Sequence, residues 1–324
     1  MTPSASTSWG IAGTGRIARE VGAVIRAQPG HVVAAVGSRD LGRAQEVASL
    51  LGAPHAHASY AALVADPTVE AVYVATPHAG HAEVVEAALR AGKAVLCEKP
   101  MTAALSETER LVALARGTGV LLMEAVWTRC NPLVQHLARL VHGGALGEVR
   151  SLRASFGFAA AYDPAGRLWD PALGGGALLD VGIYTVDLAR LLLGEPVSVE
   201  ARGSLAPTGV DAEATVALRF AGGARALLDC SITTDLPGEA TVVGSTGWAS
   251  IGPSFHAPLE LRVDGRLHTQ PDRRAGFVGE VQEVGRCLAA GLSESPVVPL
   301  ASSVATMAVL EQARLQVGAA RDGR

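Results

Sequence analysis

A carboxylate and a phenol stand four residues apart in a stretch whose other side chains are mostly apolar. The stretch is Gly174–Leu188 (GGGALLDVGIYTVDL), in which Asp180 precedes Tyr184. The apolar spacing predicts a helix, and residues four apart share one face of a helix. This arrangement favours an active-site wall in which Tyr184 exchanges a proton and Asp180 lies beside it. The alternative is a buried tyrosine hydrogen-bonded to a neighbouring carboxylate, because buried polar groups are normally paired.

A lysine follows a short buried run elsewhere in the chain. Ala94–Cys97 predicts a strand, and Glu98, Lys99 and Pro100 come directly after it. Pro100 halts the strand because it has no N–H to donate. A lysine at the end of a strand can place a cation near a reacting hydroxyl, and a nearby ammonium lowers the pKa of a phenol such as that of Tyr184. The alternative is a surface lysine that leads into the next helix, but the strand context favours the catalytic interpretation.

The elements that position these groups begin with a glycine-rich turn, Gly13–Ala18 (GTGRIA). It follows an apolar strand over Trp9–Ala12 and precedes a helix over Arg16–Ala27 and a second strand over His31–Gly37. In this pattern the first glycine makes the tight turn, the second lets the backbone approach a pyrophosphate, and the helix N-terminus supplies N–H donors. The spacing predicts a dinucleotide-binding βαβ unit rather than an ordinary glycine turn. The cofactor contacts predicted here are Gly13, Gly15, Arg16 and Ile17.

The end of the second strand carries a hydroxyl and two guanidinium groups, those of Ser38, Arg39 and Arg43. A cofactor without a 2′-phosphate is usually held at this place by an acidic side chain. Hydroxyl and guanidinium groups suit a phosphate monoester instead, through charge-assisted hydrogen bonds. We therefore expect NADP in preference to NAD. The alternative is that the two arginines are solvated residues at the start of a helix that Asp40 caps.

A third predicted strand, Val69–Thr76, is a nearly continuous apolar run, which is typical of a strand covered on both faces. A Thr-Pro-His-Ala-Gly-His loop follows it, and then a helix over Ala82–Ala91. Ligands bind at the carboxyl ends of parallel strands, so we expect this loop to start a helix and to edge the cofactor. The further cofactor contacts predicted at this edge are Thr76, Pro77, His78, His81, Glu98 and Lys99.

The sequence predicts no metal site. His78 and His81 are three residues apart, but no cluster of cysteines or carboxylates completes a ligand set. His55 and His57 are expected at the surface. The four cysteines are far apart and form no C-x-x-C pair, which favours reduced, mostly buried thiols and a cytoplasmic protein. They are Cys97, Cys130, Cys230 and Cys287.

From about residue 148 the pattern changes to short extended segments separated by turns with glycine or proline. Short spacings imply hairpins, so this second sheet is expected to be largely antiparallel. The predicted fold class is an α/β Rossmann nucleotide-binding domain (1–125) and an α+β substrate-binding domain with a large, mostly antiparallel open sheet (126–324). Its helices are expected near Val278–Ala290 and Ser302–Val317. Its expected strands are Glu148–Phe158, Val197–Ser204, Ala214–Phe220, Ala224–Ser231, Ala240–Val243 and Leu259–Val263.

A loop with large side chains, Ala159–Pro171 (AAAYDPAGRLWDP), lies between the first extended segment and the three glycines. Tyr162, Arg167 and Trp169 are predicted to cover a ligand here. The alternative is a surface loop held by one anchored tryptophan.

Composition excludes several classes of protein. The chain has 324 residues, of which 49% are hydrophobic and 18% charged, with a formal net charge of −4. This describes a globular protein, with no electrostatic attraction to nucleic acid or an anionic membrane. Apolar runs are too short to span a bilayer, and the first nine residues do not resemble a secretory signal.

Four motifs in order carry a resemblance to a known family: GTGRIA from Gly13, TPHAGH from Thr76, EKP from Glu98 and GGGALLDVGIY from Gly174. Together they resemble the glucose–fructose oxidoreductase / inositol dehydrogenase (Gfo/Idh/MocA) family. Met123–Arg129 (MEAVWTR) and the ending DVGIY resemble the branch that contains dimeric dihydrodiol dehydrogenase and NADP-dependent D-xylose dehydrogenase. Many members of the family carry histidine where this chain has tyrosine, which argues against an inositol dehydrogenase.

The resemblance implies an open second sheet with one face on helices and the other used to form a homodimer, or a dimer of dimers. It also implies that Trp127 and Phe156 line the substrate pocket. We expect an NADP-dependent dehydrogenase that acts on a small sugar or trans-diol, with Lys99, Tyr184 and Asp180 as catalytic residues. Two alternatives remain open: a keto-sugar reductase of a nucleotide-sugar pathway, and a non-catalytic NADP-binding sensor. The residues predicted to contact substrate are Trp127, Phe156, Arg167, Trp169, Asp180 and Tyr184.

Overall fold

The structure, a computed structural model, describes residues 6–318. The chain divides into two compact units, each described by itself below. The first holds the described residues up to Val126 together with Phe277–Val304, and the second holds Trp127–Gly276 and the described residues from Ala305 on. The division expected from the sequence, 1–125 and 126–324, does not foresee that 277–304 returns to the first unit.

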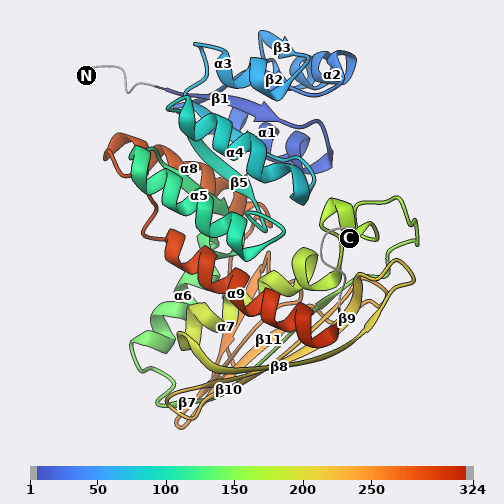
Figure 1. The fold of residues 1–324 in the computed structure, drawn as a ribbon. Coiled ribbons are helices and arrows are strands. Elements are labelled where there is room, and N and C mark those ends of the chain that lie inside the picture. The colour runs from blue at the N-terminus through green and yellow to red at the C-terminus, as the bar shows by residue number, and fades with distance from the viewer. Residues whose placement is uncertain (1–5, 319–324) are drawn as a thin grey trace. The chain divides into compact units, whose positions relative to one another are not determined.

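The first unit contains a parallel sheet in the order β3-β2-β1-β4-β5-β6 (Figure 1). Its central strands are buried on both faces, which explains their continuous apolar runs. The glycine turn and the loops after β2, β4 and β5 all leave the carboxyl edge of this sheet. The strands are β1 Thr7–Ala12, β2 His31–Gly37, β3 His55–His57, β4 Ala71–Val74, β5 Ala94–Glu98 and β6 Leu122–Ala125.

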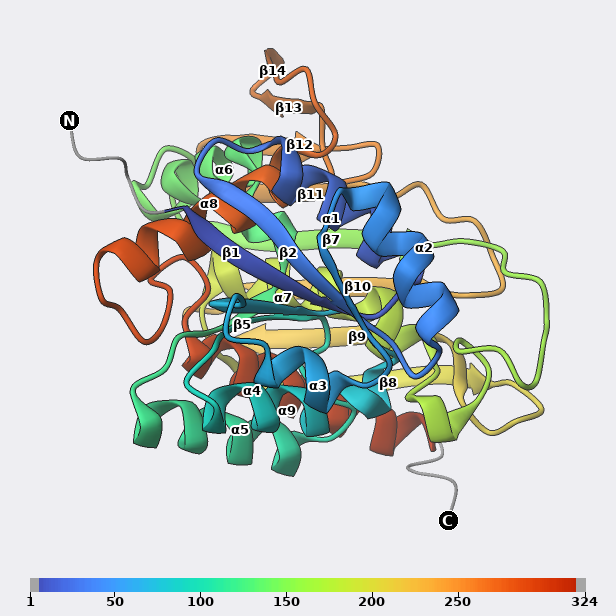
Figure 2. The same cartoon turned by 90° about the horizontal axis from the view of Figure 1, so that it is seen from above.

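Helices cover both faces of this sheet. Figure 2 shows α1 and α2 on the opposite side of the strands from α4 and α5. On the latter side Leu63, Val85 and Leu111 pack against Val72 and Val95 in one buried cluster. The helical elements are α1 Arg16–Ala27, α2 Leu41–Leu51, α3 Tyr60–Ala65, η1 His78–Gly80, α4 His81–Arg90, α5 Leu105–Thr118, α8 Ala275–Ala289 and the first turn of α9 Leu300–Val317.

The second unit contains the second sheet, in the order β14-β13-β12-β11-β7-β10-β9-β8. Its pairs are antiparallel except that β7 and β10 run parallel, which confirms the expected mostly antiparallel sheet. The strands are β7 Val149–Gly157, β8 Pro196–Leu205, β9 Asp211–Phe220, β10 Arg225–Ser231, β11 Ala240–Gly244, β12 Trp248–Ile251, β13 Glu260–Val263 and β14 Arg266–Thr269. The short elements β3, α3, β12 and β14 were not predicted, because three to six residues carry little periodic signal.

One face of the second sheet is covered by α7 (Ile183–Leu193), as Figure 1 shows. The later part of α9 is tied to the edge strand β8, since the Gln316 side chain bonds the backbone of Val199 and Ala201. Side chains alternate between buried and exposed along β9 and β10. The outer face carries charged and hydroxyl groups together with exposed Leu227 and Trp248. The remaining helical segments of this unit are η2 Trp127–Cys130, α6 Pro132–His142 and η3 Pro171–Leu173.

The helix predicted after the three glycines begins with a π-helical segment, η4 Leu178–Gly182, and becomes α-helical only at Ile183. Two close contacts are made along this segment. The Leu178 N–H donates to Asp211 Oδ2 at 2.5 Å, and Gly182 lies so close to β10 that an added Cβ would stand 3.2 Å from Cys230 Sγ. π-Helical turns of this kind occur frequently at functional sites.

The prediction of mostly buried thiols agrees with the structure, in which all four cysteines are buried. A separate finding is that, among the described residues, none of the helices combines the length and apolar character that crossing a bilayer requires.

Candidate active site

The glycine turn has the shape that a pyrophosphate needs. Gly13 has φ +127°, and a Cβ there would stand 2.6 Å from the Ala75 carbonyl oxygen, so only glycine fits. At Gly15 an added Cβ would meet no described atom within 4 Å. Gly15 also caps α1, and within the described chain no side chain bonds the N–H groups at that helix end. The turn therefore offers open space and backbone donors, which fit the phosphates of a dinucleotide.

The turn after β2 holds the residues predicted to select the cofactor. Ser38 is buried and its Oγ accepts from the Asp40 N–H at 3.2 Å. Asp40 caps α2, accepting from the Arg43 N–H at 3.0 Å. The Arg39 and Arg43 side chains are exposed. The Asp40 carboxylate caps the helix, remains 60% exposed and lies 3.9 Å from Arg43 Nε, so one carboxylate and two guanidinium groups share the surface of this turn.

His81 connects the loop after β4 to the loop after β5. Its ring is fully buried, with Nε2 2.8 Å from the Thr76 carbonyl oxygen and Nδ1 3.0 Å from the Pro100 carbonyl oxygen. Burial lowers the pKa of His81, and the carbonyl groups oppose this shift. The Lys99–Pro100 peptide bond is cis. His81 thus holds the backbone on which Lys99 is carried, and η1 and α4 begin at His78 and His81 as expected.

Beneath Lys99 lies a buried acidic group that sequence reasoning missed. The Tyr73 hydroxyl donates to Glu98 Oε1 at 2.5 Å. Glu280, from α8, is fully buried, and within the described residues neither of its carboxyl oxygens has a hydrogen-bond partner. Burial, and then the charge of Glu98, raise the pKa of Glu280 well above its usual range. Burial and the neighbouring charge of Glu98 thus favour the neutral form of Glu280, and no local motif of α8 indicated that it would face Glu98.

In the second unit, Tyr184 is the centre of an aromatic cluster. The Trp127 indole N–H donates to the Tyr184 hydroxyl oxygen at 2.7 Å, and Tyr184 is only 6% exposed. The Phe156 ring is 5.6 Å from the Tyr184 ring. His256 stacks on Phe156 with ring centroids 4.1 Å apart and lies 5.4 Å from Tyr184. His256 was not predicted, because it lies between strands in a segment without a recognisable pattern.

In the loop that precedes the three glycines, Arg167 and Trp169 have different roles. Arg167 Nη1 donates to Asp180 Oδ1 at 2.7 Å, and Arg167 is half-exposed while Asp180 is buried. Trp169 is buried and its indole N–H donates to the Ala161 carbonyl oxygen at 2.9 Å. Trp169 therefore holds the loop together, whereas Arg167 presents a guanidinium group beside the carboxylate of Asp180.

The structure thus sorts the predicted site residues into two sets. The residues predicted to bind the cofactor, including Lys99, lie at the carboxyl edge of the sheet in the first unit. The predicted substrate residues lie in the second unit, where Trp127, Phe156 and Tyr184 form one cluster and Arg167 pairs with Asp180.

A Rossmann unit of this kind, followed by a mostly antiparallel sheet on which helix α7 places a buried tyrosine, is typical of a nicotinamide-dependent oxidoreductase. Residues 7–126 match the family model described as "Oxidoreductase family, NAD-binding Rossmann fold", and residues 134–250 match "GFO/IDH/MocA C-terminal domain". The chain belongs to the GFO/IDH/MocA oxidoreductase family, which confirms the resemblance found in its motifs. It is an NAD(P)-dependent dehydrogenase or reductase acting on CH–OH groups.

Three similar proteins are informative. Trans-1,2-dihydrobenzene-1,2-diol dehydrogenase of Mus musculus is 41% identical, over 96% of this chain and 96% of that protein. Aldose-aldose oxidoreductase from Caulobacter crescentus, complexed with glycerol, has a TM-score of 0.87 at 28% identity, over 96% of this chain and 97% of that one. A 3-ketoreductase from Actinomadura kijaniata, with NADP and TDP-benzene, has a TM-score of 0.84 at 29% identity, over 96% and 98%.

Proposed function

We propose that this enzyme interconverts a secondary alcohol and a carbonyl group in a trans-diol or an aldose, with NADP as cofactor and Tyr184 as the group that exchanges the hydroxyl proton. The observation that supports this most strongly is the buried Tyr184 hydroxyl, which accepts from Trp127 and lies among aromatic rings. The indole N–H of Trp127 thus binds the phenol oxygen that, in this proposal, exchanges the proton with the substrate.

The surroundings of Tyr184 support a ring-shaped substrate with hydroxyl groups. Trp127, Phe156 and His256 present flat apolar surfaces, against which the C–H face of a cyclic diol or a pyranose packs well. Arg167 and Asp180 supply charged groups that can hydrogen-bond to neighbouring hydroxyl groups of the substrate. The names of the similar proteins, a dihydrobenzene-diol dehydrogenase and an aldose oxidoreductase, point to the same substrate classes.

The residues of the chain divide the work of the reaction. When bound, the nicotinamide supplies or accepts the hydride. During oxidation Tyr184 accepts the proton of the substrate hydroxyl, and during reduction it returns a proton to the carbonyl oxygen. We propose that the Lys99 ammonium favours the phenolate form of Tyr184, and that Asp180 orients a second substrate hydroxyl. Structures of the similar 3-ketoreductase were solved for variants with one lysine or one tyrosine replaced, which supports a role for such a pair.

The preference for NADP rests on the turn after β2. Ser38, Arg39 and Arg43 would hold the 2′-phosphate, since the one acidic side chain there, Asp40, already caps α2. The cofactor contacts proposed around the glycine turn and the strand ends are those named from the sequence. The similar 3-ketoreductase was also solved with NADP.

We also propose that two copies associate through the outer face of the second sheet, and that the protein works in the cytoplasm. Leu227, Val243 and Trp248 are exposed on this sheet, and an antiparallel sheet with apolar groups on an open face is a common interface. Four free, buried cysteines suit a reducing compartment.

Initial rates with NADP⁺ and with NAD⁺ test the proposal, using trans-cyclohexanediol, D-xylose, D-glucose and a 3-keto sugar as substrates. NADP-dependent turnover of a diol or an aldose supports it. Turnover of the keto sugar alone supports the keto-sugar reductase, which the similar 3-ketoreductase favours. NADPH binding without turnover of any substrate supports the sensor.

A further inference from the structure

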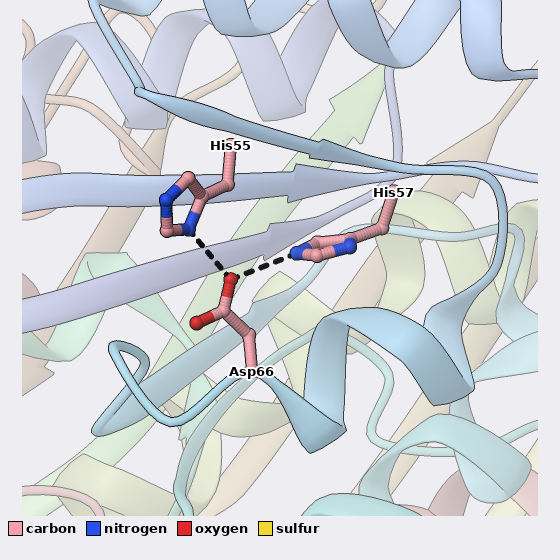
Figure 3. A group of neighbouring side chains, drawn as sticks. All are labelled: His55, His57 and Asp66. Carbon is pink, nitrogen blue, oxygen red and sulfur yellow. Dashed lines mark hydrogen bonds and ion pairs between the residues drawn. The ribbon is translucent and has the colours of Figure 1, made fainter.

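Two histidines and an aspartate converge at the edge of the first sheet, away from the catalytic groups. His55 and His57 point to the same side of β3 because residues two apart in a strand share a face, and Asp66 follows α3. Asp66 Oδ2 is 2.8 Å from His55 Nδ1 and 2.8 Å from His57 Nε2. Figure 3 shows both rings directed at this one oxygen.

Thr68 holds the Asp66 carboxylate in a fixed orientation. Asp66 Oδ1 accepts from the Thr68 N–H at 2.8 Å and from the Thr68 hydroxyl at 2.6 Å. Because Oδ1 is occupied, Oδ2 faces the histidines alone. The Asp66 side chain is 4% exposed, whereas His55 is 43% and His57 24% exposed. A fixed carboxylate therefore lies beneath two rings that solvent reaches.

We propose that His55, His57 and Asp66 form a binding site for a divalent transition-metal ion of the zinc type. Two imidazole nitrogens and one carboxylate oxygen are a common zinc ligand set, which leaves a fourth position for water. All three ligand atoms lie within 4.8 Å of one another. Thr68 is the outer partner that orients a ligating carboxylate, a contact that typically raises metal affinity.

The geometry requires only a small adjustment. Ligand atoms around a tetrahedral zinc ion are roughly 3.4 Å apart, given bonds of about 2.1 Å. Each nitrogen must therefore move away from Asp66 Oδ2 by about half an ångström, and the two nitrogens, which lie within 4.8 Å of each other, must reach the same separation. The proton on each ligating nitrogen must shift to the other ring nitrogen. Both rings are partly exposed and have room to turn outward, whereas Asp66 stays in place.

This site is distinct from the reaction centre proposed above. Three strands, β2, β1 and β4, lie between β3 and the β5 strand that ends before Lys99. The ion would connect the edge strand β3 to the segment after α3. Its effect would be on the stability of this edge, and the inference stands independently of the proposed activity.

The test uses the full chain without an affinity tag, dialysed against a chelator and then titrated with Zn²⁺. We expect one ion per chain, a rise in Tm with Zn²⁺, and at least tenfold weaker binding in His57→Gln and Asp66→Asn. The matched control is His136→Gln, since His136 and His268 form another histidine pair, with ring centroids 4.9 Å apart. This control is expected to bind Zn²⁺ as the wild type does.

A second measurement, the visible absorption of bound Co²⁺, tests the site even if a variant is less stable than the wild type. Co²⁺ bound to two histidines and a carboxylate gives visible absorption bands, which are expected for the wild type and His136→Gln and absent for His57→Gln. Folding of each variant is checked by NADPH binding. Absence of stoichiometric Zn²⁺ binding to the wild type, or binding lost in His136→Gln and kept in His57→Gln, would overturn the inference.

Discussion

The indole N–H of Trp127 donates to the hydroxyl oxygen of Tyr184 at 2.7 Å, across 57 positions of sequence. Both residues are buried, and their rings meet edge to face at 85°. A donor aimed at a phenol oxygen stabilises negative charge on that oxygen. Trp127 therefore acts directly on the oxygen atom that we propose exchanges the proton with the substrate.

Trp127→Phe is expected to lower kcat about 10–100-fold, because a hydrogen bond to a charged group contributes roughly 1.5–3 kcal/mol. NADPH affinity is expected to stay the same. Steady-state kinetics and a cofactor titration measure both quantities. Trp9→Phe is the control. This variant also loses an indole hydrogen bond, the one from Trp9 to His31 Nδ1 at 3.0 Å, but Trp9 lies in the first unit and makes no contact with Tyr184 in this proposal. A kcat equal to that of the wild type in Trp127→Phe would show that the bond is only structural.

Tyr184→Phe and Lys99→Met are each expected to lose about 10²–10⁴-fold in turnover, the usual contribution of acid–base catalysis. NADPH binding should persist, because the glycine turn at Gly13 is unchanged in both variants and Lys99 is only one of the many proposed cofactor contacts. Single-turnover rates and fluorescence titration with NADPH are the measurements. Near-normal turnover in both variants would remove these residues from the mechanism.

Cofactor preference provides a separate prediction. Arg43→Gln is expected to raise KM for NADP⁺ about 10–100-fold through loss of one charge-assisted bond. Ser38→Asp is expected to shift the preference toward NAD⁺, because a carboxylate suits the ribose hydroxyls. KM for NAD⁺ serves as the internal control for Arg43→Gln. Equal losses with both cofactors would mean that Arg43 does not bind the 2′-phosphate.

Asp211 gives a pH dependence of stability. Burial raises its pKa to about 6, and the Leu178 N–H opposes this shift. The folded state then holds a proton that the unfolded state has lost, so this contribution to stability falls as pH rises from about 4 to about 6.

Urea unfolding of the wild type and of Asp211→Asn at pH 4.5 and pH 7 measures this effect. Relative to the variant, the wild type is expected to gain about 2 kcal/mol at the lower pH. A difference that does not change with pH would show that Asp211 titrates normally in the folded protein.

His81→Phe keeps a ring of similar size but removes both contacts to the Thr76 and Pro100 carbonyl groups. We expect a loss of about 1–3 kcal/mol in the free energy of unfolding, the cost of leaving buried polar groups unsatisfied. His142→Phe, which loses one exposed bond to the Leu191 carbonyl, should change stability by less than about 0.5 kcal/mol. Denaturant unfolding of the two variants side by side tests the difference.

Much of the first unit was predictable because its signals are local. Gly13 needs a backbone angle that only glycine adopts readily, and β4 and β5 are short apolar runs with turns at their ends. Order along the chain then places Lys99, Thr76 and Ser38 at one edge, since the strands of a βαβ sheet all run in the same direction. These residues could be assigned before any coordinates were known, and the four motifs already indicated the family.

What only the tertiary structure decided depends on pairs that are distant in sequence. Trp127 meets Tyr184, His256 stacks on Phe156, Glu280 faces Glu98, and Asp211 holds the first N–H of the π-helical turn. The histidines of β3 were expected at the surface, and their convergence on Asp66 depends on where α3 ends. Periodicity and turn chemistry act over a few residues, whereas these contacts are selected by how helices and strands pack. For that reason the sequence determined the cofactor-binding framework and singled out Tyr184 as the proposed catalytic residue, and the packing decided which groups surround that tyrosine.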